Sequence, residues 1–255
     1  MNKNVYLLLL ICSFNLLCLA SCSNRKPNYI AHAGGCIDGH PYTNCLEAVE
    51  NSLSHGISII ELDLQLTTDS VLVAAHDWAH FHDISGHIGD TTSVSLDEFT
   101  SRKILGKYTP ISFPMIDSIL EANPNLFIMT DKISDPKLLS RFLHRDRIMI
   151  EAFGMSDYYE LDTMGFYKVF YSDSPKSYRK AFNKWVKRIL HIPSSPNPTR
   201  YTFWFLGEEH GGNTSNYRSA YGREFAVFTV KNKHEADSVA ALDRRIKYIY
   251  IDEVE

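Results

Sequence analysis

The 255-residue chain has no run of basic residues, no internal repeat and no low-complexity tract. Its formal net charge is only -4, from 26 lysine and arginine residues against 30 acidic ones. Because nucleic-acid binding depends on clustered positive charge, nothing in this balance indicates a nucleic-acid partner. With 44% hydrophobic and 22% charged residues, the chain can bury a full core, and one domain is expected.

The chain also lacks a stretch suited to spanning a membrane. Residues 5–19 are mainly apolar but short and interrupted, and Lys3 gives them a weakly basic start. Residues 19–22, Leu-Ala-Ser-Cys, match a bacterial lipobox, which predicts a lipoprotein signal peptide over residues 1–21 and lipidation of Cys22. We therefore expect a lipid-anchored protein of the bacterial cell envelope, facing the periplasm or the exterior. The alternative is an ordinary secretory signal cut nearby.

Cysteine is scarce, with five residues in all. Cys12 and Cys18 belong to the predicted signal and Cys22 carries the lipid, which leaves Cys36 and Cys45 in the folded part. These two could form a disulfide in an oxidising compartment, or remain two buried thiols. Their spacing in the sequence does not decide between a disulfide and two free thiols, because a disulfide requires a specific geometry.

Two carboxylates stand two residues apart in a β-rich run. Residues 57–76 read ISIIELDLQLTTDSVLVAAH, and a period of two places Glu61 and Asp63 on the same face of a strand. Side by side these charges repel, so a divalent cation between them is the simplest explanation. The alternative is a half-exposed strand with a solvated polar face.

Two histidines bracket this acid pair. Residues 28–35, NYIAHAGG, form an apolar strand that delivers His32 to a glycine turn, and His76 ends the strand that follows Asp63. A lone histidine at a strand end is usually structural. A metal with two imidazoles is, however, a sufficient set of groups for acid/base cleavage of a phosphodiester.

These motifs resemble those of the glycerophosphodiester phosphodiesterases, which share a barrel with the phosphatidylinositol-specific phospholipases C. The family pattern is His-Arg-Gly, Glu-Asn-Thr, Glu-Leu-Asp and His-Asp, in that order. The matching stretches are residues 32–35, 43–48, 61–63 and 76–77, and residues 225–232 and 248–252 resemble the family's last strands. Ala33 replaces the family's arginine, a phosphate contact, and Thr43 replaces its glutamate, a metal ligand, which leaves the substrate open.

The resemblance implies a (β/α)8 TIM barrel, in which residues 22–255 form one phosphodiesterase domain. A small insertion after the third strand, residues 77–109, would lie beside the mouth of the barrel and shape the substrate pocket. We expect later strands at residues 126–131, 148–153, 168–171, 225–230 and 248–252. Residues 199–206 form either a further strand or a hydrophobic wall, and residues 174–190 are amphipathic.

A third acid, Asp131, ends the strand LFIMTDK. All strands of such a barrel end at one rim, so Asp131 can approach Glu61 and Asp63. We predict that these three side chains bind Mg²⁺ or Ca²⁺, because their ligand atoms are hard oxygens. Lys132 is predicted to bind substrate, with a salt bridge to Asp131 as the alternative.

Asn44 has two interpretations. It either binds substrate or caps a helix over residues 44–55, paired with Glu47. In the insertion, His80, His82 and His87 have a spacing loosely typical of metal ligands, but a polar lid with surface histidines is favoured.

The function that the resemblance implies is metal-dependent hydrolysis of glycerophosphodiesters to glycerol 3-phosphate and an alcohol, with His32 and His76 as general acid and base in either order. The expected partner is a small-molecule or lipid-derived phosphodiester, with the membrane reached through the lipid anchor. One alternative is a phospholipase C-like or D-like enzyme acting on a lipid or a phosphodiester-linked glycan. The acyl chain of a lipid could then contact Tyr201, Phe203, Trp204 and Phe205, although packing in the barrel is favoured for these residues. Another is a non-catalytic binding lipoprotein on the same barrel.

Overall fold

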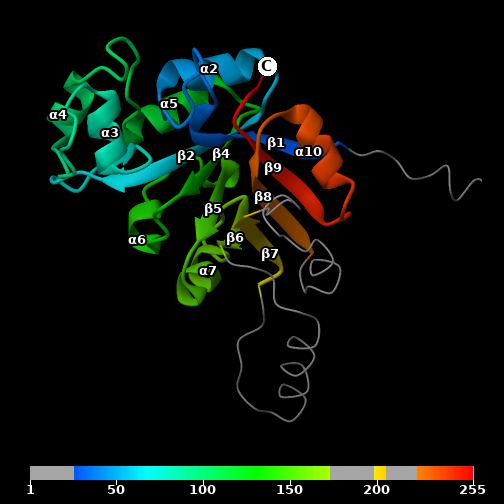
Figure 1. The fold of residues 1–255 in the computed structure, drawn as a ribbon. Helices are drawn as coiled ribbons and strands as arrows, with labels where there is room; N and C mark the ends of the chain where they lie inside the picture. Colours follow the sequence, from blue (N-terminus) through cyan, green and yellow to red (C-terminus); the bar gives the residue numbers. More distant parts are fainter. Residues whose placement is uncertain (1–25, 173–197, 205–222, 255) are drawn as a thin grey trace, which may run out of the picture.

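The computed structural model describes residues 26–172, 198–204 and 223–254. In this part of the chain, eight parallel strands close into a barrel, because β1 (Asn28–Ala31) pairs with both β2 (Ile59–Leu66) and β9 (Ile246–Ile251). Between β2 and β9 the barrel runs through β4 (Phe127–Asp131), β5 (Ile148–Ala152), β6 (Lys168–Ser172), β7 (Arg200–Trp204) and β8 (Glu224–Val230). The predicted TIM barrel is confirmed (Figure 1).

Short helices connect the strands on the outside of the barrel (Figure 1). They are α2 (Leu46–Ser54), α5 (Phe113–Ala122), α6 (Pro136–Leu139), α7 (Met155–Leu161) and α10 (Lys233–Ala240), with 3₁₀ turns η1 (His32–Gly34) and η2 (Arg145–Arg147). One face of each strand packs in the larger apolar cluster with these helices, as Ile60, Leu62 and Leu64 of β2 do. The other face fills the barrel interior with a second cluster that includes Met129 and Met149. The acids of β2 therefore project inward, above the apolar residues that fill the barrel interior, here called the apolar plug.

The third strand of the chain, β3 (Leu72–Ala74), is not part of the closed barrel. It pairs antiparallel with the end of β2 and leads into the insertion, residues 77–109, which carries α3 (Trp78–Ile84) and α4 (Leu96–Ser101). The apolar residues of the insertion, among them Phe81 and Phe99, pack in one cluster with Ala48 of α2 and Val73 of β3. In Figure 1 it forms a separate lobe on one side of the barrel.

Most element boundaries fall within two residues of those predicted, and residues 200–204 form a strand, which decides between the two alternatives for that region. The predicted helix cap is wrong. Helix α2 begins at Leu46 with Cys45 in the N-cap position. The Glu47 carboxylate accepts instead from the backbone amide and hydroxyl of Thr109, at 2.8 and 2.9 Å. The amphipathic residues 174–190, residues 205 and 206, the predicted signal peptide and Cys22 lie outside the described residues.

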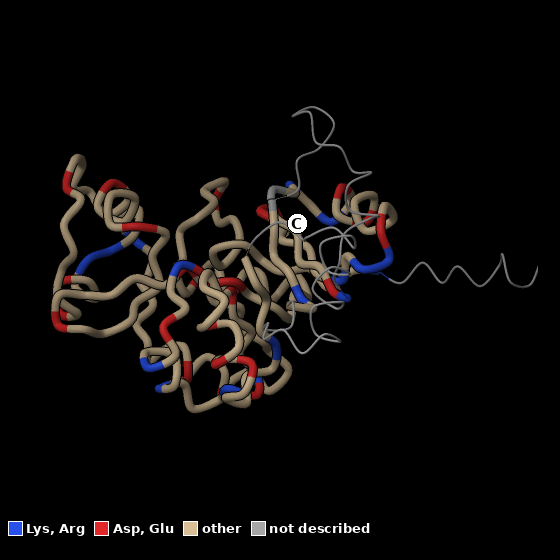
Figure 2. The backbone as a smooth tube through the Cα atoms, turned by 90° about the horizontal axis from the view of Figure 1, so that it is seen from below, with Lys and Arg blue, Asp and Glu red and all other residues tan. Residues whose placement is uncertain are grey.

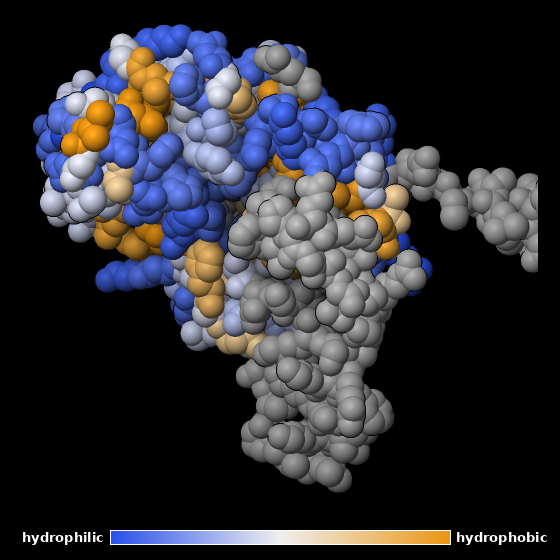
Figure 3. All heavy atoms as spheres, in the orientation of Figure 1, coloured by the Kyte–Doolittle hydropathy of each residue, from blue (hydrophilic) through white to orange (hydrophobic). Residues whose placement is uncertain are grey.

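Cys36 and Cys45 are not joined by a disulfide; Cys45 is buried and Cys36 partly so. Among the described residues, no helix is long and apolar enough to cross the bilayer. Acidic and basic residues are scattered over the described part of the chain in Figure 2. The face shown in Figure 3 is mostly hydrophilic, with separate apolar patches.

Candidate active site

A cavity of about 480 Å³ lies at the carboxyl ends of the barrel strands. It is lined by His32, Tyr42, His76, Asp131, Lys132, Glu151, Phe153, Ser172, Phe228 and Tyr250. These residues come from the barrel strands or directly follow them, apart from Tyr42 and His76. Contrary to expectation, the insertion at residues 77–109 contributes no side chain to this lining, although it begins directly after His76.

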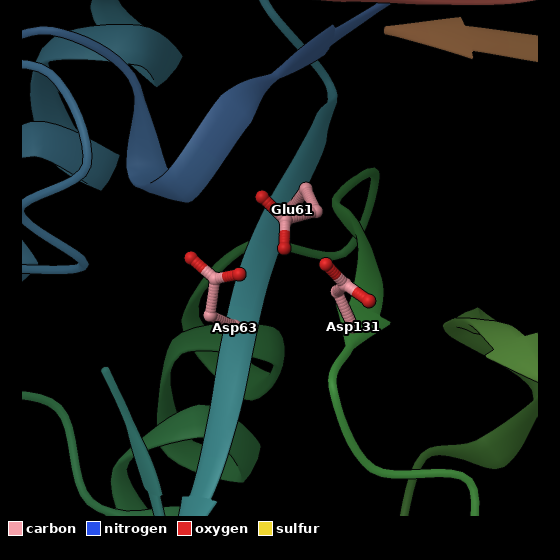
Figure 4. A group of neighbouring side chains, drawn as sticks. All are labelled: Glu61, Asp63 and Asp131. Carbon is pink, nitrogen blue, oxygen red and sulfur yellow. The ribbon is translucent and has the colours of Figure 1, made fainter. Parts of the chain in front are cut away.

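Three carboxylates converge beside this cavity. Glu61 and Asp63 project from β2 and Asp131 from the end of the neighbouring β4, and one oxygen of each lies within 4.8 Å of the others (Figure 4). Glu61 and Asp63 are 1% and 0% exposed, so the alternative of a solvated polar face is wrong. The register pairs Asp63 with Asp131, which explains how residues far apart in sequence come together.

The arrangement is electrostatically strained without a cation. Burial, with the charges of Asp63 and Asp131, raises the pKa of Glu61 well above its ordinary value. The Ala33 amide donates to Glu61 Oε2 at 2.6 Å, whereas Glu61 Oε1 is buried and accepts no hydrogen bond from the described residues. Asp63 Oδ1 is also buried without a hydrogen bond, and its nearest cationic group is Lys132 Nζ at 3.4 Å. Buried oxygens left open beside a third carboxylate fit a hard divalent cation.

Asn44 fixes the orientation of Asp63. Its amide nitrogen donates to Asp63 Oδ2 at 2.9 Å, and its Oδ1 accepts from the Asp63 backbone amide at 3.0 Å. Asn44 is fully buried, adopts a left-handed φ of 51°, and does not line the cavity. The structure therefore gives Asn44 a positioning contact to a predicted metal ligand in place of a helix cap.

Lys132 lines the cavity and also neutralises part of the acid cluster. Its Nζ lies 3.1 Å from Asp131 Oδ2 and 3.4 Å from Asp63 Oδ1. Burial lowers the pKa of Lys132, but the two carboxylates outweigh burial and raise it above the ordinary lysine value. The left-handed φ of 69° at Lys132 turns the chain sharply after Asp131, so that both of these adjacent side chains reach the site.

Each predicted catalytic histidine is held by an aspartate. His32 Nδ1 lies 2.9 Å from Asp252 Oδ1, and His76 Nδ1 lies 2.8 Å from Asp77 Oδ2. A carboxylate on Nδ1 favours the tautomer with the proton on that nitrogen and leaves Nε2 to accept a proton. The Tyr42 ring lies between the two imidazoles, with centroid distances of 4.8 Å to His32 and 5.7 Å to His76.

Asp252, Asp77 and Tyr42 had no role predicted from the sequence, although the first two stand in stretches that match the family pattern. Asp252 ends the last strand motif, YIYID, and Asp77 follows His76 directly. Tyr42 precedes the Thr43-Asn44 motif at a left-handed φ of 59°. Burial and the charge of Asp252 raise the pKa of Tyr42, so it stays a neutral phenol at physiological pH.

Glu151 is a further acid in the cavity, and it was not predicted from the sequence. It projects from β5, is 4% exposed, and accepts a hydrogen bond from the Tyr250 hydroxyl of β9. Burial, followed by the charge of Asp131, raises the pKa of Glu151 well above its ordinary value. A single acid in the otherwise apolar stretch IMIEAF was the available signal.

The histidines of the insertion form no metal cluster within the described residues. His82 is fully buried, not a surface residue: its Nε2 lies 2.7 Å from the Thr92 carbonyl oxygen and its Nδ1 lies 2.7 Å from Arg102 Nη1. His80 lies beside the site, with its ring centroid 5.8 Å from that of His76. Burial and the neighbouring His76 lower the pKa of His80.

Solved structures with the same fold include an Oleispira antarctica phosphodiesterase in complex with the product sn-glycerol-3-phosphate. It shares 14% identity at a TM-score of 0.59, covering 89% of this chain and 93% of its own. A glycerophosphodiester phosphodiesterase from Parabacteroides distasonis gives 18% identity and a TM-score of 0.59, covering 89% and 94%. At such identities the likeness shows the fold.

Sequence comparison is more specific. Mouse and human proteins named "Lysophospholipase D GDPD3" are each 47% identical over 47 residues, which is 18% of this chain and 14% of each relative. The matched segment thus spans about a seventh of those proteins. The glycerophosphoryl diester phosphodiesterase family model, in contrast, matches residues 35–204, which carry the acid cluster, His76 and much of the barrel. The chain belongs to the glycerophosphoryl diester phosphodiesterase family.

Proposed function

We propose that the protein hydrolyses glycerophosphodiesters to glycerol 3-phosphate and an alcohol, with His32 and His76 as general acid and base. One observation carries this proposal: two histidines, each hydrogen-bonded to an aspartate, and a cluster of three carboxylates lie around one cavity. Family membership supports the same reaction. The Oleispira antarctica structure, in which the product sn-glycerol-3-phosphate is bound, supports a small-molecule phosphodiester.

The acid cluster would hold a divalent cation, Mg²⁺ or Ca²⁺, through Glu61, Asp63 and Asp131. When bound, such a cation neutralises charge on the phosphate and makes phosphorus easier to attack. Lys132 stands at the same edge of the cavity with a positive charge, and it would contact a phosphate oxygen. Asn44 would keep Asp63 in the required orientation through its two hydrogen bonds.

The two histidines divide the proton transfers between them. One Nε2 takes the proton of the attacking hydroxyl, from water or from the neighbouring glycerol hydroxyl, and the other imidazole donates a proton to the leaving oxygen. Asp252 and Asp77 hold the rings and stabilise whichever imidazole is charged. Since both histidines have the same kind of support, the geometry gives neither one the base role.

A lipid substrate is the second candidate. Phe153 lines the cavity with 43% of its surface exposed, and Phe228 lines it as well. Such apolar side chains at the mouth would suit an acyl chain, and the matched mouse protein is named a lysophospholipase D. A glycerophosphodiester remains favoured, because most of the lining residues carry a polar or charged group.

We further propose that the mature protein is anchored by lipid on Cys22 in the bacterial cell envelope. Strand β1 begins at Asn28, only six residues after Cys22, so the tether would be short. The cavity lies at the carboxyl ends of the strands, at the opposite end of the barrel from Asn28. Anchoring at that end would favour diesters that reach the cavity from the water phase.

The test is turnover by the full-length chain, solubilised in detergent, on glycerophosphocholine and on lysophosphatidylcholine. His32→Ala and His76→Ala should each lower kcat by on the order of 10² to 10⁴, and the double variant should fall far short of additivity. His55→Ala, at an exposed position on the end of α2, is the matched control. Near-normal turnover in either single variant would make that histidine structural. Faster cleavage of the lipid would favour the second candidate.

A further inference from the structure

We infer that Glu151 belongs to a subsite that binds a hydroxylated part of the substrate, and that it selects polyol-bearing phosphates over alkyl ones. This inference rests on the proposed function, because it assigns a place to the glycerol part of the substrate. It starts from a carboxyl group that the proposed reaction leaves without a role. Glu151 lines the cavity but is 4% exposed, so it is set deep in the wall.

Glu151 is next to the cation cluster without being part of it. It projects inward from β5, beside β4 with its Asp131, but its oxygens fall outside the 4.8 Å group formed by Glu61, Asp63 and Asp131. The Tyr250 hydroxyl donates to Glu151 Oε1, and the Ser172 hydroxyl hydrogen-bonds the same carboxyl group. These two contacts hold the group in place and leave it further hydrogen-bonding capacity.

The partners of Glu151 also line the cavity. Ser172 comes from β6 and Tyr250 from β9, so three barrel strands place hydroxyl or carboxyl groups around one part of the wall. The Ser172 and Tyr250 hydroxyls can each donate and accept a hydrogen bond, and the Glu151 carboxyl offers further acceptor oxygens. Groups of this kind match the hydroxyls of an alcohol.

An apolar wall completes the subsite. Phe153 follows β5 two residues after Glu151, and Phe228 stands on β8 with its ring centroid 6.1 Å from that of Tyr250. Glycerol has carbon-bound hydrogens as well as hydroxyls, so it can present one side to the aromatic rings and the other to Glu151 and Ser172. The phosphate would then lie toward Lys132 and the acid cluster.

The test compares two phosphate monoesters that differ only in hydroxyl groups, sn-glycerol 3-phosphate and propyl phosphate. Their dissociation constants are measured by calorimetry on the full-length chain in detergent with Mg²⁺. The wild type should bind glycerol 3-phosphate about tenfold or more tightly, the effect of one or two well-made hydrogen bonds. Glu151→Leu should reduce this preference to within about twofold, whereas Glu151→Gln, which keeps an acceptor oxygen in the same place, should retain most of it.

Met149→Leu is the matched control, since Met149 points inward from the same strand but belongs to the apolar plug. It should leave the preference unchanged. If Glu151→Leu does not fold, Ser172→Ala tests the same subsite and should lower the preference severalfold.

The inference would be overturned if the wild type bound the two monoesters equally, bound neither of them, or bound choline phosphate more tightly than glycerol 3-phosphate. It would also be overturned if the preference survived in folded Glu151→Leu. Diester turnover is measured separately. An active enzyme without the preference refutes the subsite alone, and an inactive protein with the preference refutes the proposed reaction alone.

Discussion

Replacing Asp63 by Asn should abolish the thermal stabilisation that a divalent cation gives to this protein. The substitution keeps the shape of the side chain and an oxygen for the Asn44 amide, but it removes one of the three charges that face the proposed cation. The substitution should therefore weaken cation binding much more than it lowers the stability of the fold.

The structure sets the expected magnitudes. Two unit charges 4.8 Å apart repel by about 3.5 kcal/mol at an effective dielectric constant of 20, so the cation-free cluster is under strain. The variant loses this repulsion together with the contact to Lys132, and we expect the two changes largely to cancel. A cation at 100 times its dissociation constant stabilises the wild type by about 2.7 kcal/mol. In a chain of this size that raises Tm by roughly 5–10 °C.

The same effect should depend on pH through Glu61. Its pKa in the cation-free fold is raised above the ordinary 4.5, so its proton favours the fold at low pH, and this contribution is lost as the pH rises through the raised pKa. A cation must displace that proton. The cation-induced rise in Tm should therefore be small near pH 4.5 and should grow as the pH rises through the raised pKa.

The assay is thermal unfolding of the full-length chain with Mg²⁺, Ca²⁺ or chelator across a series of pH values. Asp117→Asn is the matched control, because Asp117 is a buried acid outside the cluster. It should keep the full response to the cation, whereas Asp63→Asn should shift by less than about 2 °C. An Asp63→Asn protein that responds like the wild type would refute the assignment of Asp63 as a ligand.

Three further results are expected. Asp252→Asn should lower kcat on the order of 10²-fold with little change in KM, because the His32 ring stays in place but loses the carboxylate on Nδ1. Steady-state kinetics would measure this loss, and an unchanged kcat would contradict the role of Asp252. Lys132→Met should raise KM for the diester. It should also lower the Tm of the cation-free protein, since the three carboxylates lose their neighbouring positive charge. An unchanged KM would show that Lys132 does not contact the substrate. Mass spectrometry of the mature amino terminus should find diacylglycerol on Cys22, and a Cys22→Ser protein that still partitions into detergent would refute the lipobox.

Much of the site could be predicted because its residues stand at the ends of strong apolar strands. The alternation in β2 placed Glu61 and Asp63 on one face, and the common rim of a barrel placed Asp131 beside them. What alternation could not show is that both faces of β2 are buried. In a closed barrel the polar face turns inward, which makes the acids far more strained than on an open sheet.

Contacts between distant segments were beyond the sequence. Nothing local indicates that Asn44 would hold Asp63 in preference to capping α2, or that Tyr250 would reach from β9 to Glu151 of β5. The insertion was placed correctly in the chain but its role was not: it supplies Asp77, which holds His76, and His80, which lies beside His76, but no side chain of the cavity lining. Its buried His82 follows from the packing of the insertion's apolar residues.

The most direct measurement of the central claim is product analysis by ³¹P NMR after the full-length chain is incubated with glycerophosphocholine, with a divalent cation or with chelator. We expect glycerol 3-phosphate as the phosphorus-containing product, formed with the cation and lost with chelator. Release of choline phosphate would place the cleavage on the other side of phosphorus. Turnover unaffected by chelator, or no product at all, would refute the proposed metal-dependent reaction.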